Sequence, residues 1–164
     1  MPGFDIERAR RAHSATSWTP EKRAEQERDA YTAHLAAVRA QLDPIAETPE
    51  QRAELDRLMT DYAAAYLAKT YAVLDARSRT MNPMVTGPAR FPTARNRKRM
   101  ETELRRDEER EAWSIRAQAR MRRTIEAMRT PEQTETAAYN DLARHLTRTL
   151  AALEKIDAND PQLH

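Results

Sequence analysis

Residues 80–99 read TMNPMVTGPARFPTARNRKR and form the one long interruption in a chain whose composition and apolar spacing otherwise indicate helix. The three prolines of this stretch fix φ at about −65° and favour extended backbone in the residues before them. Gly87, which precedes one of these prolines, can adopt φ > 0, so the pair predicts a sharp change of direction. Because apolar side chains lie within the stretch, we expect an ordered Pro/Gly loop at residues 80–92, anchored to a core.

Two interpretations of this loop are open from the sequence. In the first, the loop only connects two long helices, because an ordered long loop is by itself a weak sign of function. In the second, the loop is a rigid platform that presents the basic side chains of residues 90–99 to an acidic partner.

The composition around the loop predicts an all-α fold. Two of the 164 residues are glycine, 5% are aromatic and 33% are charged, and these proportions favour long solvated helices over sheets. The length suits one domain with a buried core. We expect a helical bundle of about four long helices plus a short N-terminal helix. This single helical domain would span residues 1–156, with a flexible C-terminal tail at residues 157–164.

Three helix starts carry the same signal, Thr-Pro-Glu, at residues 19–21, 48–50 and 130–132. In each case the threonine can cap the helix, the proline suits the first helical position, and the acid lies in the first turn. The sequence therefore predicts helices that begin at these three prolines. A further long helix is expected to follow the loop, from about residue 92 to residue 129, and a short one to follow Asp5.

Apolar residues recur every three or four positions in the predicted helices, as on the seam of a bundle. The helix after residue 20 carries Tyr31, Leu35, Val38 and Leu42, and the last helix carries Tyr139, Leu142, Leu146, Leu150 and Leu153. The helix from residue 49 to residue 79 has the broadest apolar face, so we expect it to be the central core helix. Its tyrosines, at positions 62, 66 and 71, could stack on nucleic-acid bases, but their helical spacing favours core positions.

The charges are unevenly distributed along the chain. Residues 77–123 carry 14 basic and six acidic side chains, so this window has a charge of +8 although the whole chain has only +2. Such an asymmetry can steer an anionic partner to one region, and it can equally provide complementarity within the chain or between two copies.

The basic loop and the helix that follows it are the candidate binding surface. Its predicted residues are Arg90, Phe91, Arg95, Asn96, Arg97, Lys98, Arg99, Arg105 and Arg106. Nucleic acid or a nucleoprotein complex is the expected partner, because arginine contacts to phosphate provide most of such affinity. The alternative is a helical scaffold or oligomer, with a dimer as one form, that uses the same surface to bind an acidic protein face.

The sequence contains none of the motifs that would indicate an enzyme or a metal site. There is no cysteine, and the four histidines lie outside every metal-binding spacing that we considered. With two glycines, a phosphate-cradling loop is not expected either. We therefore expect a non-enzymatic protein without cofactor or metal.

The apolar runs are too short for a membrane span of about 20 residues, and the N-terminus lacks the apolar segment of a secretory signal. We therefore expect a cytoplasmic protein that does not contact membranes.

Residues 84–92, MVTGPARFP, followed by residues 94–99, ARNRKR, resemble a motif of helical proteins from phages, plasmids and conjugative elements. In that motif an apolar-Thr/Ser-Gly turn leads through Phe-Pro into a basic helix. The resemblance covers about 20 residues of the chain. It implies an accessory protein of a mobile element, for example an anti-defence inhibitor of the anti-CRISPR or antirestriction kind. No catalytic residues carry over from the motif.

Overall fold

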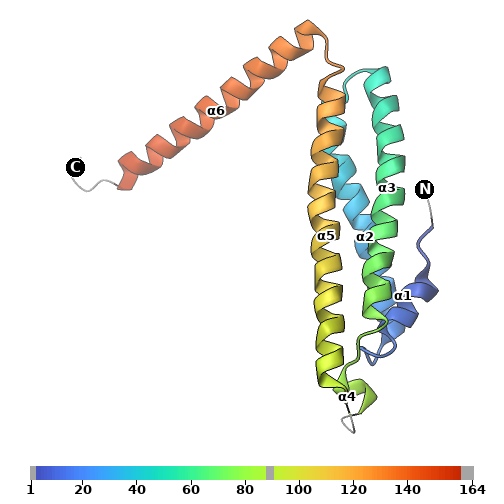
Figure 1. Ribbon diagram of the computed structural model, residues 1–164. Helices are drawn as coiled ribbons and strands as arrows, with labels where there is room; N and C mark the ends of the chain where they lie inside the picture. Colours follow the sequence, from blue (N-terminus) through green and yellow to red (C-terminus); the bar gives the residue numbers. More distant parts are fainter. Residues whose placement is uncertain (1–2, 88–90, 160–164) are drawn as a thin grey trace. The chain divides into compact units, whose positions relative to one another are not determined.

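The computed structural model describes residues 3–87 and 91–159, with the backbone alone for residues 155–159. All secondary-structure elements assigned in these residues are helices, so the all-α prediction is confirmed. The elements are α1 (Ile6–His13), α2 (Pro20–Leu42), the 3₁₀ turn η1 (Asp43–Ile45), α3 (Pro49–Arg77), α4 (Pro83–Thr86), α5 (Thr93–Glu126) and α6 (Pro131–Asn159) (Figure 1). The chain divides into two compact units, residues 1–125 and residues 126–164. A single domain over residues 1–156 stays a prediction.

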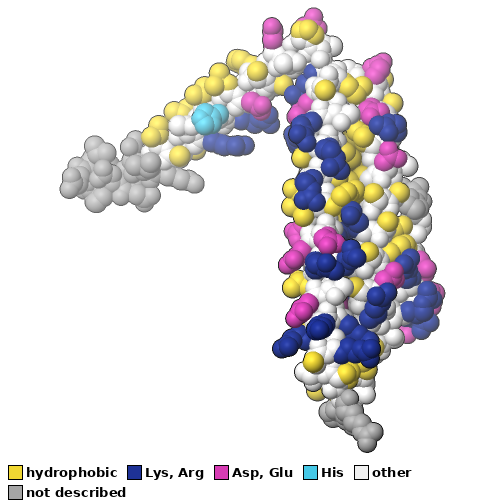
Figure 2. Space-filling model, in the orientation of Figure 1, with side chains coloured by type: hydrophobic (Ala, Val, Ile, Leu, Met, Phe, Trp, Pro, Cys, Tyr) yellow, Lys and Arg dark blue, Asp and Glu magenta, His cyan; other side chains and the backbone are white. Residues whose placement is uncertain are grey.

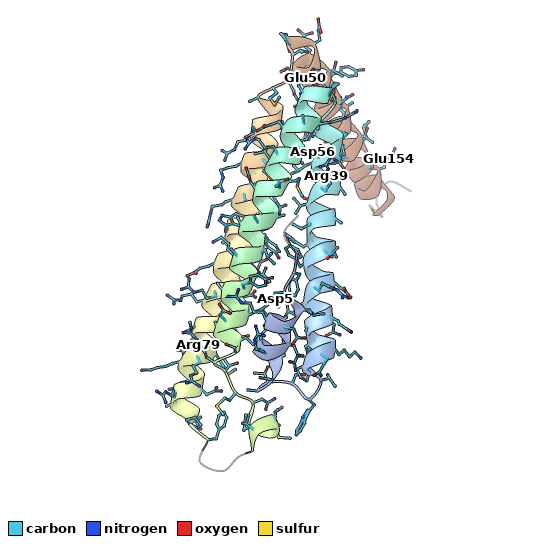
Figure 3. All side chains as sticks on the ribbon, turned by 90° about the vertical axis from the view of Figure 1, so that its right-hand side faces the viewer. Asp5, Arg39, Glu50, Asp56, Arg79 and Glu154 are labelled. Atoms are coloured by element: carbon cyan, nitrogen blue, oxygen red, sulfur yellow. The ribbon has the colours of Figure 1, made fainter. Side chains whose placement is uncertain are left out.

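The first unit is built from α2, α3 and α5, which lie side by side, and from α1, which packs on α2 and α3 (Figures 1 and 3). The seam predicted for α2 is buried, and α3 contributes more buried residues than any other helix, as expected of the central core helix. Leu55 and Leu74 of α3 are among the largest fully buried side chains. Burying a leucine stabilises the fold by about 1.5–3 kcal/mol. An ion pair between Arg39 and Asp56 joins α2 to α3 at the surface (Figure 3).

Most aromatic residues of α2, α3 and α5 belong to the core of the first unit. A series of stacked rings crosses from α2 through α3 to α5, with neighbouring centroids 4.1 to 6.1 Å apart; its members are Tyr31, Tyr66, His34, Tyr62 and Trp113. Tyr62 and Tyr66 are buried and Tyr71 is half-buried, so the core interpretation of the tyrosines is confirmed. The Tyr62 hydroxyl lies 2.7 Å from both His34 Nε2 and Ser114 Oγ, which satisfies these polar atoms inside the bundle.

The three Thr-Pro helix starts differ in their caps. The Thr48 hydroxyl accepts a hydrogen bond from the Gln51 amide at 3.2 Å, and Gln51 Oε1 accepts one from the Thr48 amide at 3.0 Å. Thr130 and Gln133 form the same capping box at 3.2 and 3.0 Å. Thr19 makes no side-chain cap, which corrects the prediction for α2. The return bond of the box is also missing, because the third helical residue of α2 is a lysine rather than Glu or Gln, and the Thr19 amide donates to Ser17 Oγ at 3.1 Å instead.

The loop before α5 contains a short helix, α4, where the sequence predicted only a loop. Asn82 caps α4 by accepting a hydrogen bond from the Met84 amide at 2.9 Å, and Gly87 ends it with φ of 90°. Gly87 thus adopts the positive φ expected of it, while the change of direction predicted for residues 87–88 stays a prediction, since residues 88–90 lie outside the described range. The loop after Arg77 joins the body of the fold where the Asn82 amide donates to the Ala15 carbonyl at 2.9 Å.

The ends of the chain also differ from the predictions. The short N-terminal helix is present, as predicted, and is capped by Asp5; its buried side consists of Ala9, Ala12 and His13. At the other end, α6 continues to Asn159, so the first residues of the predicted tail are helical, while residues 160–164 lie outside the described range.

The second unit contains α6, whose apolar stripe is exposed. In Figure 2 the hydrophobic side chains of α6 (yellow) run along one side of the helix, and its basic side chains (dark blue) lie on the other. Along the described part of the chain, none of the helices is both long and apolar enough to span a membrane.

Candidate nucleic-acid interface

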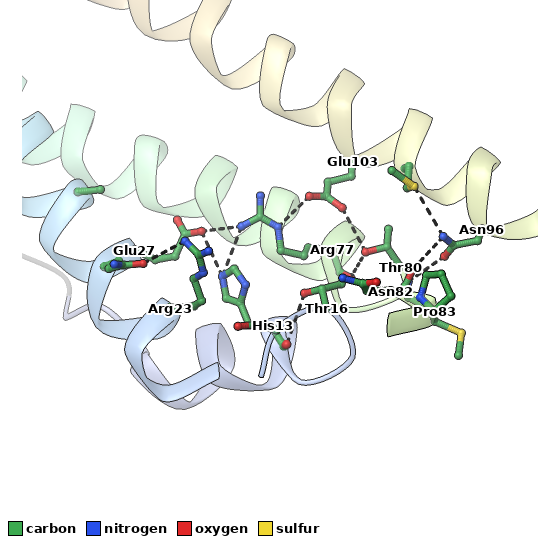
Figure 4. Close-up of a pocket in the computed structure, with 15 residues that line it drawn as sticks. His13, Thr16, Arg23, Glu27, Arg77, Thr80, Asn82, Pro83, Asn96 and Glu103 are labelled. Carbon is green, nitrogen blue, oxygen red and sulfur yellow. Dashed lines mark hydrogen bonds and ion pairs between the residues drawn. The ribbon is translucent and has the colours of Figure 1, made fainter. Parts of the chain in front are cut away.

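A cluster of charged side chains joins four helices beside the loop that leads into α5. Arg77 at the end of α3 lies between Glu27 of α2 and Glu103 of α5, with nitrogen–oxygen distances of 2.6 and 2.7 Å (Figure 4). His13 of α1 completes the cluster, because its Nε2 lies 3.2 Å from the same Glu27 oxygen that binds Arg77. Each of these side chains is less than one third exposed. These four residues are called the polar cluster below.

The surroundings of Glu27 in the polar cluster lower its pKa and so favour its ionised form. The hydrogen bond from His13 lowers the pKa of Glu27 against the opposing effect of burial, and the charge of Arg77 lowers it further. Burial disfavours the charge of Arg77, but the bonds to Glu103 and Glu27 outweigh this effect and raise the Arg77 pKa. Arg77 pairs with both carboxylates inside the fold, so this cluster holds helices together rather than offering free charge to a ligand.

The polar cluster forms one wall of a hollow of about 730 Å³, and the loop after α3 forms another (Figure 4). Asn96, in the first turn of α5, holds this loop in place. Its side-chain oxygen accepts a hydrogen bond from the Met81 amide at 2.8 Å, and its nitrogen donates to the Met81 carbonyl at 2.9 Å. Asn96 is only 5% exposed. This corrects its assignment to the binding surface, because its amide group is used inside the protein.

The exposed basic residues of α5 are arranged along the helix. Lys98, Arg105 and Arg116 are spaced by 7 and 11 residues, which are close to two and three helical turns, so they lie in line on one side. Arg95 and Arg120 lie within about 60° of this line, near its two ends. All five are exposed and have no ion pair or side-chain hydrogen bond with any described residue. We call Arg95, Lys98, Arg105, Arg116 and Arg120 the α5 basic face; at 1.5 Å per residue it extends for about 38 Å.

Figure 2 shows basic side chains (dark blue) along the length of α5, with acidic ones (magenta) among them. The acids are concentrated at residues 107–111, between the two halves of the α5 basic face. Two of these acids are already paired, Asp107 with Arg110 at 2.5 Å and Glu109 with Arg106 at 2.9 Å. The basic face therefore has two positive ends separated by an acidic turn, in which Glu108 and Glu111 remain beside the two paired acids.

The remaining predicted binding residues have different positions. Arg97 is exposed but lies about 100° around α5 from Lys98. Arg99 is half-buried and donates to the Arg79 carbonyl at 2.7 Å, so its guanidinium is partly used to hold the end of α3. Phe91 is half-buried. Arg106 is paired as described above, and Arg90 lies outside the described residues.

The structure adds a basic residue from a different helix. Lys69 of α3 lies over the ring of Trp113, with its ammonium 5.3 Å from the ring centroid. Lys69 and Trp113 line a surface hollow of about 500 Å³ together with Arg105 and Arg116 of the α5 basic face. The sequence offered no signal for this neighbour, because it depends on how α3 and α5 are packed.

The described residues contain no group of three or more His, Cys, Asp or Glu side chains that could hold a metal ion. No protein family, curated protein or solved structure matches the chain. The arrangement of its own side chains is therefore the basis for a functional proposal.

Proposed function

We propose that this protein is a non-enzymatic nucleic-acid-binding protein and that it contacts the phosphate backbone through the α5 basic face. The observation that carries the proposal is that five exposed cations lie along one helix without an ion pair to any described residue, although acids lie between them. Elsewhere in the first unit, arginines beside acids form pairs, as Arg8 does with Asp75 at 2.5 Å. Cations left unpaired along a rod attract a polyanion most strongly.

The chemistry favours phosphate contacts over the reading of bases. The basic side chains are spread over about 38 Å of a straight helix, and they include arginines, whose planar guanidinium suits phosphate oxygens. The half-buried Trp113 beside Lys69 offers one aromatic face next to these cations. We therefore expect binding with little sequence preference.

Salt dependence tests this mechanism. If all five cations of the α5 basic face neutralise phosphates of duplex DNA, the slope of log K against log salt is about −4 to −5, since each contact contributes about −0.9. Fluorescence anisotropy with labelled duplex DNA and single-stranded RNA, from about 50 to about 300 mM salt, measures this slope.

A charge-reversal variant with a matched control locates the surface. The variant Lys98→Glu, Arg105→Glu and Arg116→Glu is expected to lose binding at least about 100-fold at low salt. The control reverses three exposed cations elsewhere, Arg11→Glu, Lys22→Glu and Arg148→Glu, and changes the net charge equally. Equal losses in both variants would show a general charge effect. An absence of binding by the parent protein to any DNA or RNA at low salt would reject the proposal in favour of an acidic protein partner.

The resemblance of residues 84–99 to proteins of mobile elements suggests the setting in which such binding is used. We propose an accessory role against a host defence system that acts on nucleic acid. Plasmid establishment in cells with an active restriction or CRISPR system, compared between the parent and the charge-reversal variant, tests this role. Equal establishment with and without the protein would reject it.

A further inference from the structure

The apolar stripe of α6 has no partner among the described residues of its own unit. The exposed fractions of its five large side chains range from 52% to 72%; they are Tyr139, Leu142, Leu146, Leu150 and Leu153. A single helix with a continuous apolar row is marginally stable in water, because most helical stability comes from packing of that row. We therefore expect the stripe to pack against another apolar surface.

The spacing of the stripe identifies what fits it. The five residues follow one another at intervals of 3, 4, 4 and 3, which is the same series in both directions about Leu146. If two α6 helices run antiparallel with Leu146 at the twofold axis, Leu142 of one copy faces Leu150 of the other. In the same register Tyr139 faces Leu153. Every member of the stripe then meets a member of the stripe, as a self-complementary twofold interface requires.

The flanks of the stripe also suit a second copy. Positions beside the central part of the row are occupied by small or uncharged side chains, such as Ala143 and Thr149. The charged residues of this part lie on the opposite side of α6, where Arg144 pairs with Asp141 at 2.5 Å. No charge is therefore buried when the two rows meet, and antiparallel helices also oppose their dipoles favourably.

Other exposed apolar side chains provide a poorer match. Met100, Leu104 and Ile115 of α5 are 57% to 63% exposed, but they do not form a continuous row. Glu108 and Glu111 lie on the same side of α5 between Leu104 and Ile115, as their spacing of three and four residues shows. Packing a leucine row on this side would bury two carboxylates, which is costly.

We propose that the protein forms a dimer in which the α6 helices of two copies pair antiparallel about Leu146. The ten side chains of two stripes, at about 60–120 Å² each, bury roughly 1,000 Å². This area is near the lower limit for a specific interface, so the dimer is weak and depends on concentration. The interface uses residues of the second unit, whereas the α5 basic face belongs to the first.

Sedimentation equilibrium of the full chain, from about 1 to about 200 µM, measures the association. The parent is expected to change from monomer to dimer over this range. Leu146→Glu places two carboxylates at the twofold axis and is expected to remain monomeric throughout. Ala151→Glu introduces the same side chain away from the stripe and is expected to associate like the parent. A monomeric parent at all concentrations, or a Leu146→Glu variant that associates like the parent, would overturn the proposal.

Cross-linking distinguishes the antiparallel register from other pairings, because the chain has no cysteine of its own. With a bis-maleimide of about 10 Å reach, Leu146→Cys is expected to form cross-linked dimers efficiently. The Tyr139→Cys variant alone is not expected to cross-link, since position 139 of one copy lies about 20 Å from position 139 of the other in the antiparallel pair. A mixture of Tyr139→Cys with Leu153→Cys is expected to cross-link again. Efficient cross-linking of Tyr139→Cys with itself would instead indicate parallel helices and would contradict the proposal.

Discussion

Helices α3 and α6 begin alike and end up in opposite environments. Both contain 29 residues, and both start with Thr-Pro-Glu-Gln and close the same capping box. Both carry a row of large apolar side chains. In α3 the row is the centre of the core, with Leu55 fully buried, whereas Leu146 in the middle of the α6 row is 53% exposed.

The two helices show that the signals that start a helix differ from the contacts that bury it. The capping box and the proline at the first position act within one turn, so they define a helix start wherever they occur. Burial depends on neighbours, and α3 lies against α1, α2 and α5. The α6 row has the same spacing of apolar residues, and in our proposal it is buried only when a second copy of the chain binds.

The largest difference is expected for leucine truncation. Leu55→Ala leaves a cavity in the core and is expected to lower the free energy of unfolding of the first unit by about 3 kcal/mol. Leu146→Ala is expected to change this free energy by less than about 0.5 kcal/mol at micromolar protein, where α6 pairs are dissociated. Urea unfolding followed by tryptophan fluorescence measures both values. Equal losses would mean that Leu146 is part of the same cooperative core.

A slightly smaller effect is expected for arginine removal at the end of α3. Arg77→Met leaves Glu27 and Glu103 without their cation inside the fold, and we expect a loss of about 3 kcal/mol or somewhat less. Arg148→Met on α6 removes an exposed cation and should leave the urea midpoint nearly unchanged. A loss below about 0.5 kcal/mol for Arg77→Met would show that the polar cluster is not a structural joint.

The caps are expected to contribute about 1 kcal/mol where the hydrogen bond exists. Thr48→Ala should lower the thermal stability of the first unit, and Thr19→Ala should not, because Thr19 makes no side-chain cap. Thr130→Ala is expected to reduce the helical circular dichroism of α6 without changing the unfolding of the first unit. A similar loss for Thr19→Ala and Thr48→Ala would contradict the difference in their caps.

The smallest effect is expected from protonation of His34, which packs on the tyrosines of α3. Burial, with a contribution from the charge of Arg110, lowers the pKa of His34 in the folded protein. Below pH of about 6.5 the unfolded chain therefore binds a proton more readily than the folded one, and stability declines as the pH falls. Urea midpoints between pH 8 and 5 measure this decline. His34→Gln should remove it, whereas His145→Gln on α6 should preserve it.

Much of the fold was predictable because its signals are local. The Thr-Pro starts placed α2, α3 and α6, and the spacing of Tyr31, Leu35 and Val38 identified a buried seam. The failures have a different origin. Asn96 was expected on the surface and is buried, whereas Ile115, an apolar residue of the same helix, is 63% exposed. Both outcomes depend on how α5 is rotated against its neighbours, which no short stretch of sequence encodes.

The candidate interface was predicted in part. Exposed cations at the start of α5 followed from the charge window, and Arg95, Lys98 and Arg105 lie on the α5 basic face. The sequence did not predict that Arg99 and Arg106 bind partners within the chain, or that Lys69 of α3 lies beside this face. Both follow from the packing of the helices. Charge patterns identify the region of a surface, but the pairing of each side chain is a tertiary property.

The polar cluster has a consequence for the order in which the protein folds. Its bonds link residues 14, 26 and 50 positions apart in the chain, and they join α1, α2, α3 and α5. Such distant groups can meet only after the long loops between them have closed, so these bonds are expected to form after the rate-limiting step. The cluster should therefore act mainly on unfolding. Removing Arg77 is expected to leave the folding rate nearly unchanged and to increase the unfolding rate.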